Sequence, residues 1–395
     1  MEMDACRKGY FTMHYKRLLT WIDGSSSYLS VGLDVGADFT WMSIALPNGA
    51  FIGKPFKIVH SDPRSRDLAV TKIKEAQETY SLKSRCFLES TGIYHIPLLC
   101  FLRDKGFDCS VINPIITKNS TNINIRKLHN DKFDSKKAAL VGLNVSLKTS
   151  ILPDDSVVDL RNLVRDYYYF KDLQSAVALK LTAELKVSFP AYAKVFSKVT
   201  TQSSLKLLSS YPLPEDMLAA SKEDIVDIIR STARFGEAYA LRKYDAIISA
   251  AQDAAVFGRA LPSNAVRIRL YIDTYQEYQK HLDALLKALH ETVEKLQDTL
   301  IYDQICLLQS LYGIGFLSAV VLVAEMGDFK LFSSPKKLYA YFGLDPAVKQ
   351  SGKLNGDKVH MSKRGSSLAR RVLHMAALNN VKVAKGSGTP VNPVV

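Results

Sequence analysis

The sequence has few cysteines, and no pattern makes them work together. Five occur in 395 residues, and none belongs to a Cys-x-x-Cys pair. This number and scatter exclude a disulfide framework and a tetrahedral zinc site. We therefore predict that Cys6, Cys86, Cys100, Cys109 and Cys306 are buried apolar residues.

Long hydrophobic runs are lacking as well. No stretch reaches the roughly 18 apolar residues that a membrane-spanning helix needs. The apolar patch at residues 18–22 is too short for the core of a signal peptide and has no small-residue cleavage site. We expect a cytoplasmic, nucleoid-associated protein that has no membrane partner.

Acidic residues are in the minority, with 39 Asp and Glu against 52 Lys and Arg, which gives a formal charge of +13. The excess is concentrated after residue 330, where basic residues far outnumber Asp345 and Asp357. This end is a candidate polyanion-binding surface, and the alternative is an ordinary solvated basic face. The candidate nucleic-acid-binding cations are Lys349, Lys353, Lys363, Arg364, Arg370 and Arg371.

Residues 29–150 alternate between strand and helix patterns, and residues 1–28 precede them as an extension without a clear period. Three strands, the second and third joined by an Asn48-Gly49 turn, predict a meander. The later elements are a helix at 67–80, a strand at 85–90, a helix at 95–106, a strand at 107–114, a helix after Pro114 and a helix at 131–147. This order predicts an RNase H-like (RuvC-like) α/β domain.

Residues 151–300 form a helical pattern with breaks at residues 211–214 and near Leu261-Pro262. The last stretch spaces its apolar residues alternately by three and four, which predicts a long helix in a coiled coil. The alternative is a core helix of a bundle. The apolar positions are Tyr275, Tyr278, Leu282, Leu285, Leu289 and Leu296.

Residues 301–395 predict a third, mostly helical domain with short helices separated by glycines. Gly313 and Gly315 suggest a helix-hairpin-helix-like element that presents backbone N–H groups to a phosphate. The alternative is a glycine-tightened turn that only packs. An irregular loop carrying Ser351 follows, and a final helix is expected from about Ser366.

Four carboxylates stand at positions where the predicted fold would bring them together: Asp34, Glu89, Asp131 and Asp134. Asp34 interrupts an apolar strand, where a carboxylate is costly to bury without a metal or a basic partner. Phosphodiester cleavage with two Mg²⁺ ions needs such a group of oxygen ligands. Taken singly, Asp131 or Asp134 could instead cap a helix, and Glu89 could pair with a basic residue.

Ser351 precedes a glycine in a loop with basic neighbours. A serine becomes a nucleophile only when a base or metal activates it, and nearby cations would help to hold the attacked phosphate. By its local pattern alone, however, a serine before glycine is most often a turn residue.

Five ordered motifs give the chain a family resemblance: GLDVGADFTWMSIALPNG, FLESTGIYHIPL, HNDKFDSKKAALVGL, LLQSLYGIGFLSAVVLVAEMGD and FSSPKKLYAYFGLDPAVKQSGKLNGDKVHMSKRGSSLARRVLHMAA. Together they resemble the DEDD transposases of the insertion-sequence one-ten family. The match covers residues 29–150 and 300–383, and the helical middle is similar to the family's coiled-coil region.

The resemblance implies that Asp34, Glu89, Asp131 and Asp134 bind Mg²⁺ or Mn²⁺, and that Ser351 is a nucleophile that forms a phosphoserine link to DNA. It further implies a composite site across protomers of a dimer or tetramer, and a structured guide RNA encoded by the element. The expected function is DNA cleavage and strand exchange of an insertion sequence.

Two departures from the family pattern accompany this resemblance. Gly36-Ala37 replaces a Ser-Lys-like pair beside the first aspartate, and relatives continue past the point where this chain ends at Val395. One alternative is therefore a truncated, non-catalytic DNA- or RNA-binding protein. Another is an ATP-dependent enzyme of the actin and sugar-kinase type, although no later Asp-x-Gly or Gly-Gly motif supports it.

Overall fold

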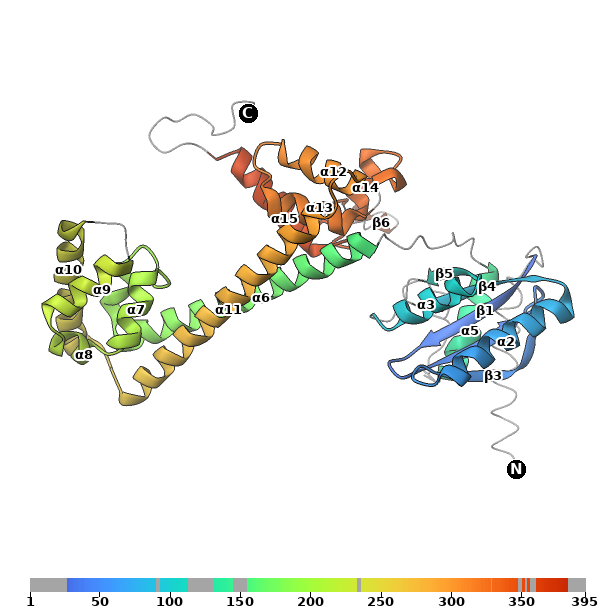
Figure 1. Cartoon of the computed structure of the whole chain (residues 1–395), viewed down its shortest axis with the longest axis horizontal. Coiled ribbons are helices and arrows are strands. Elements are labelled where there is room, and N and C mark those ends of the chain that lie inside the picture. The colour runs from blue at the N-terminus through green and yellow to red at the C-terminus, as the bar shows by residue number, and fades with distance from the viewer. Residues whose placement is uncertain are drawn as a thin grey trace. The chain divides into compact units, whose positions relative to one another are not determined.

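The computed structural model describes residues 27–89, 93–112, 131–144, 155–232, 236–327, 329–346, 350–351, 354–355 and 360–382. The chain divides into two compact units, residues 1–152 and 153–395 (Figure 1). Each unit has its own hydrophobic core. We describe each unit by itself.

The first unit is built on a five-stranded mixed sheet with the order β3-β2-β1-β4-β5. Strands β1 to β3 form the expected antiparallel meander, and β4 and β5 continue the sheet parallel to β1. Its strands are β1 (Tyr28–Val35), β2 (Phe39–Ala45), β3 (Phe51–Val59), β4 (Lys83–Glu89) and β5 (Asp108–Ile112). This topology fits the predicted RNase H-like α/β domain.

Alternation along β1 assigns its side chains to two different layers. Leu29, Val31, Leu33 and Val35 belong to the core shared with helices α2 (Pro63–Tyr80) and α3 (His95–Asp104). The residues between them face the third helix, α5 (Asp131–Asn144), on the other side of the sheet. The two faces of the sheet are therefore both covered by helices (Figure 1).

Helix α5 approaches the sheet closely because small residues line the contact. A Cβ atom added to Gly32 would lie 2.1 Å from the carbonyl oxygen of Ser135 and 2.2 Å from the nitrogen of Ala139. The Ser30 hydroxyl donates to the Ala139 carbonyl at 2.6 Å, and the Tyr28 hydroxyl donates to the Gly142 carbonyl at 2.8 Å. These contacts set the position of α5 along β1.

The second unit is organised by two long helices, α6 (Asp155–Ser188) and α11 (Pro262–Glu294). They pack antiparallel, because Gln174 bonds to Gln279 at 2.9 Å while Glu184 bonds further along α6 to Arg267, which lies earlier in α11 (Figure 1). The predicted long helix thus pairs with a helix of its own chain.

Five short elements pack around one end of this pair. Their core includes the fully buried side chains of Phe189 and Tyr192. Both predicted breaks are confirmed, because α7 ends before residues 211–213 and α10 ends before residue 262. The elements are η1 (Pro190–Lys194), α7 (Gln202–Ser210), α8 (Pro214–Ala219), α9 (Lys222–Thr232) and α10 (Glu237–Phe257).

The other end carries the C-terminal helices, with α13 at the centre of their core. All residues of α13 from Ala319 to Met326 are buried, and they pack with Leu160 of α6 and Leu289 of α11. The elements here are α12 (Leu300–Gln309), α13 (Phe316–Met326), η2 (Phe329–Leu331), α14 (Pro335–Tyr341), β6 (Gln350–Ser351), β7 (Leu354–Asn355) and α15 (Ser367–Asn380).

Several local expectations need correction. The helix expected from residue 67 begins at Pro63, because Asp62 caps it by accepting from the Arg64 N–H. Cys86 and Cys109 are buried as predicted, but Cys100 is only half-buried and Cys306 is exposed. Cys6 and the helix expected after Pro114 lie outside the described residues.

The loop expected around Ser351 also differs, because it contains a short antiparallel hairpin of β6 and β7. Searching the described part of the chain, we found no helix long and apolar enough to cross a membrane.

The close contact at Gly32 predicts a large cost for a single methyl group. Gly32→Ala should destabilise the first unit by about 1–3 kcal/mol or more, because the backbone of α5 must move away. Urea denaturation measures this. Gly236→Ala is the matched control, since an added Cβ there meets nothing within 4 Å. Equal costs at both glycines would contradict the tight approach.

Candidate functional site

Asp34 is the penultimate residue of β1 and lies on the face that α5 covers. In the adjacent parallel strand, Leu88 pairs with Leu33, so the next residue, Glu89, comes level with Asp34. Asp34 is half-buried, and it stands at the end of its strand rather than in the middle as the pattern suggested.

Helix α5 brings its first turn to the same place. Gly142, Ala139 and Ser135 follow one another along α5 while they contact Tyr28, Ser30 and Gly32 in turn. The next step along β1 is Asp34 and the next turn of α5 holds Asp131 and Asp134. The geometry therefore directs all four predicted carboxylates toward one end of the sheet.

The electrostatics of Asp34 reflect this arrangement. Burial, followed by the negative charges of Asp134, Asp131 and Glu89, raises the pKa of Asp34 from 3.8 to about 7. Lys137 opposes the shift only in part. Within the described residues no ion pair joins Glu89 to a Lys or Arg, so its alternative interpretation as a paired surface residue gains no support.

The side chains of this cluster are of the chemical type that binds a divalent cation, but in the part of the chain that the structure describes they do not lie close enough together to bind one jointly. Carboxylate oxygens are the ligands that Mg²⁺ and Mn²⁺ prefer, and the raised pKa of Asp34 marks a site short of positive charge. However, no three Asp, Glu, His or Cys side chains of the described segments lie close enough together to hold one metal ion. Binding a cation would therefore require these carboxylates to move closer.

Ser351 lies in β6, where it pairs with Leu354 of β7. It belongs to the second compact unit, whereas the four carboxylates belong to the first. Lys349 and Lys353 lie outside the described residues. Lys363 and Arg364 are exposed just before α15, so they are available to an anionic partner.

The two arginines of α15 make contacts within the chain. Arg370 donates to the carbonyls of Phe342 at 2.9 Å and Gly365 at 2.7 Å, which ties α15 to the end of α14. Arg371 donates to both carboxylate oxygens of Asp172 on α6, at 2.8 and 3.0 Å. Arg370 therefore has a structural task that a charge count does not reveal.

The two glycines of the predicted hairpin differ. Gly313 has a φ of +81°, and an added Cβ would lie 2.7 Å from Nδ2 of Asn380, so this residue packs against α15. Gly315 precedes α13 as its N-terminal cap, and an added Cβ there would meet nothing within 4 Å. Gly315 is exposed, and an exposed glycine at a helix N-terminus is compatible with a phosphate contact.

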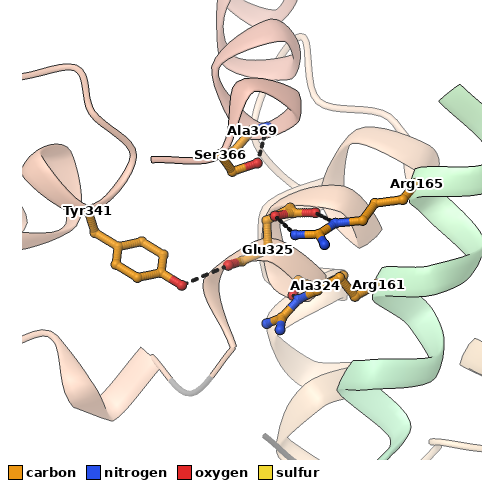
Figure 2. A network of polar contacts seen from close by, with 7 residues as sticks. All are labelled: Arg161, Arg165, Ala324, Glu325, Tyr341, Ser366 and Ala369. Carbon is orange, nitrogen blue, oxygen red and sulfur yellow. Dashed lines mark hydrogen bonds and ion pairs between the residues drawn. The ribbon is translucent and has the colours of Figure 1, made fainter. Parts of the chain in front are cut away.

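The sequence patterns missed a buried ion pair at the centre of the C-terminal helices. Glu325 of α13 is only 4% exposed and accepts two hydrogen bonds from Arg165 of α6, at 2.7 and 3.0 Å (Figure 2). Its backbone carbonyl accepts from the Tyr341 hydroxyl at 3.3 Å. A glutamate inside the apolar run VVLVAEM was the available signal.

Two further contacts join the same elements. Arg161 donates to the Ala324 carbonyl at 2.8 Å, and the Ser366 hydroxyl caps α15 by accepting from the Ala369 N–H at 3.1 Å (Figure 2). Burial would raise the pKa of Glu325, but hydrogen bonds from Arg165 and Ser366 and the charges of Arg165 and Arg161 hold it below its ordinary value. A cavity of ≈ 530 Å³ lies beside this network, between α6 and the start of α15.

The raised pKa of Asp34 predicts a pH-dependent stability. Its folded pKa of about 7 exceeds the ordinary value of 3.8, so the stability contribution is complete below pH 4 and is lost as the pH rises through 7. Asp34→Asn removes the penalty and should stabilise the metal-free protein at pH 8 by about 1 kcal/mol, after allowance for solvent screening. Urea denaturation with a chelator at pH 5 and pH 8 measures it. A gain that is the same at both pH values would contradict the electrostatic cause.

The Glu325 network predicts an asymmetric response to substitution. Arg165→Met leaves a buried carboxylate without its partner and should cost about 2–4 kcal/mol at pH 7. The loss should shrink toward pH 4, because the stabilisation from the lowered pKa of Glu325 disappears as the pH falls through that pKa. The double variant Arg165→Met with Glu325→Met should lose less than Arg165→Met alone. Thermal unfolding over this pH range is the measurement, and an additive double variant would overturn the explanation.

Comparison with known proteins places the chain among transposases. Residues 31–190 match the model of the IS110-type DEDD domain, described as "Transposase", and residues 306–389 match the model described as "Transposase IS116/IS110/IS902 family". A Sinorhizobium fredii protein described as "Putative transposase y4qE" is 29% identical over 121 residues. That match covers 29% of this chain and 31% of the relative, so the two are comparable over about a third of their lengths.

Among solved structures, Thermus thermophilus RuvC in complex with a Holliday junction substrate resembles 29% of this chain and 91% of its own, at 10% identity and a TM-score of 0.21. The family assignment does not depend on that likeness. Its basis is the two domain models, which match residues 31–190, where the four carboxylates lie, and residues 306–389 of the C-terminal helices, separately and in order. The chain belongs to the IS110-type family of DEDD transposases.

Proposed function

We propose that this protein is a DNA transposase or recombinase that cleaves and rejoins the strands of an insertion sequence. The observation that carries the proposal is the convergence of Asp34 with Glu89, Asp131 and Asp134 at one end of the RNase H-like sheet. A structural role explains this cluster poorly, because like charges in a half-buried site oppose folding. A divalent cation and a phosphate would make the arrangement favourable.

Asp34, Glu89, Asp131 and Asp134 would hold Mg²⁺ or Mn²⁺, which when bound supplies positive charge for an attacking and a leaving oxygen. The protein side chains provide the negative charge that selects a cation here. With its raised pKa, Asp34 is partly protonated at neutral pH until its neighbours' charges are compensated. A bound cation would therefore favour the ionised form of Asp34 at neutral pH.

Ser351 is the proposed nucleophile for joining. Its hydroxyl oxygen would form a bond to a DNA phosphorus while the bond from that phosphorus to the leaving sugar oxygen breaks. The hydroxyl proton passes to a base, and the leaving oxygen takes up a proton. Lys363 and Arg364 carry exposed charge in the same unit that can hold DNA phosphates.

Further contacts to DNA and to partner molecules complete the proposal. The N-terminus of α13 behind Gly315 suits a DNA phosphate, and Gly313 supports it by letting the turn pack on α15. A structured guide RNA and a homodimer or homotetramer rest on the family resemblance alone. Lys349 and Lys353, each two positions from Ser351 in the sequence, are proposed to contact DNA as well.

Excision in cells tests the proposal. Cells carrying the whole genomic locus are assayed by PCR for the circular junction left by the excised element, with wild-type protein, Asp34→Asn or Ser351→Ala. Circles should appear with wild type and fall to background with both variants, because each removes one proposed chemical group. Purified Asp34→Asn should still bind DNA in a salt-sensitive manner, since the basic surface is unchanged.

Matched controls separate the chemistry from general damage. Asp273→Asn and Ser175→Ala change exposed residues of α11 and α6 and should leave circle formation intact. Circles that persist with Asp34→Asn would reject the acidic site. Loss of circles with lysine and arginine substitutions alone would favour a protein that only binds nucleic acid.

A further inference from the structure

A row of aromatic side chains with lysines above them lies next to the acidic cluster. Trp41 of β2 is the direct cross-strand partner of Asp34 on one side and of Lys57 on the other. Directly paired residues of antiparallel strands share one face of the sheet. Asp34, Trp41 and Lys57 therefore lie side by side across three strands, on the face that α5 covers.

Lysine ammonium groups are held over these rings. Lys132, between the two carboxylates of α5, places Nζ 4.7 Å from the centre of the Trp41 ring. Lys57 places Nζ 3.9 Å from the Phe39 ring, two residues along β2. Lys136, one turn after Lys132, places Nζ 5.0 Å from the Phe51 ring. Trp41, Phe39, Lys57 and Lys132 thus lie beside the site. Phe51 and Lys136 continue the row further along the sheet, where Phe51 pairs with Ala45 opposite Ser30.

Packing alone does not account for Trp41. The two residues that follow it on the same face, Ser43 and Ala45, are buried against α5, and the Ser43 hydroxyl lies 2.8 Å from that of Ser135. Trp41 comes where this contact ends, and it remains half-buried, as do Phe39 and Phe51. Lys57 and Lys132 are exposed. The large indole of Trp41 is therefore partly exposed to solvent next to the acidic cluster.

Interleaved rings and cations suit an unpaired nucleic-acid strand. Stacking of a base on an aromatic side chain is worth about 1–3 kcal/mol, and it needs a base face that a duplex does not present. The lysines bring positive charge to the phosphates of the same strand. They also offset the repulsion that the carboxylates exert on those phosphates.

We propose that Phe39, Trp41, Phe51, Lys57, Lys132 and Lys136 form a binding surface for an unpaired nucleic-acid strand, with one nucleobase stacked on Trp41 beside Asp34. This inference rests on the proposed function for its biological setting, but binding to the surface does not require cleavage. Its ligand is an unpaired nucleotide, which a DNA strand and an RNA strand can both supply.

Tryptophan fluorescence tests the stacking directly. The chain has two tryptophans, so Trp21→Phe in the full-length protein makes Trp41 the only reporter. We expect a ten-nucleotide oligothymidylate to quench this fluorescence, and a matching abasic strand and a DNA duplex to quench it far less. Oligouridylate is titrated in parallel, and the strand that binds more tightly identifies the preferred source. Equal quenching by the abasic strand or the duplex overturns the proposal.

A second experiment measures the affinity of the protein for dye-labelled single strands, with a chelator present to prevent cleavage. Trp41→Leu should weaken binding about tenfold, which corresponds to about 1.4 kcal/mol of lost stacking, whereas Trp41→Phe should retain most of the affinity. Lys57→Gln should reduce the dependence of affinity on salt. If folded Trp41→Leu, checked by circular dichroism, binds within twofold of wild type, the surface is rejected.

The two proposals can fail separately. Quenching and a Trp41→Leu defect in a protein that forms no circles support the strand-binding surface and reject only the transposition chemistry. Circle formation combined with abasic strands that bind as well as normal ones rejects the surface and leaves the transposition chemistry in place.

Discussion

The contact between Gly32 and the backbone of α5 is the constraint on which the first unit depends. No side chain larger than a hydrogen atom fits there, because the carbonyl of Ser135 and the nitrogen of Ala139 already occupy the space. Hydrogen bonds from Ser30 and Tyr28 then lock the helix to β1 at two further points along its length. A helix held this closely cannot slide, so the position of its first turn relative to Asp34 follows from residues that carry no charge.

Because these contacts hold α5 in place, the fold tolerates an acidic cluster whose charges repel one another. Burial, followed by the charges of the three other carboxylates, raises the pKa of Asp34 to about 7, and only Lys137 is found to oppose the shift. The lysines over Trp41 and Phe39 lie beside the cluster, and the one over Phe51 lies further along the sheet; none of them is found to act on Asp34 as Lys137 does. Negative charge is thus concentrated at a point and positive charge is distributed around it, which is the arrangement that admits a cation at the centre and an anionic polymer at the edge.

The sequence predicted the sheet of this unit well, because its signals are local. Alternating apolar residues and the Asn48-Gly49 turn determine the meander. The four acidic positions were predicted because Asp34 interrupts a strand, Glu89 ends one, and Asp131 and Asp134 begin a helix. The sequence could not predict the side-chain contacts that depend on how neighbouring strands are aligned. The pairing of Asp34 with Trp41 and of Trp41 with Lys57 follows from strand alignment, and the lysines over the rings follow from the depth at which α5 packs. Neither quantity is encoded in a short motif.

The second unit shows the same limit in its charges. Twelve basic residues near the C-terminus predicted a nucleic-acid surface, yet Arg370 bonds to two backbone carbonyls and Arg371 to Asp172, while Lys363 and Arg364 stay exposed. The buried ion pair between Arg165 and Glu325 joins residues 160 positions apart and gives no sequence signal beyond one glutamate in an apolar helix. A carboxylate that is 4% exposed must keep its partner, so Arg165 holds α13 against α6. Net charge therefore predicts that the partner is an anion such as a nucleic acid. Only the contacts within the chain show which lysines and arginines remain exposed to bind it.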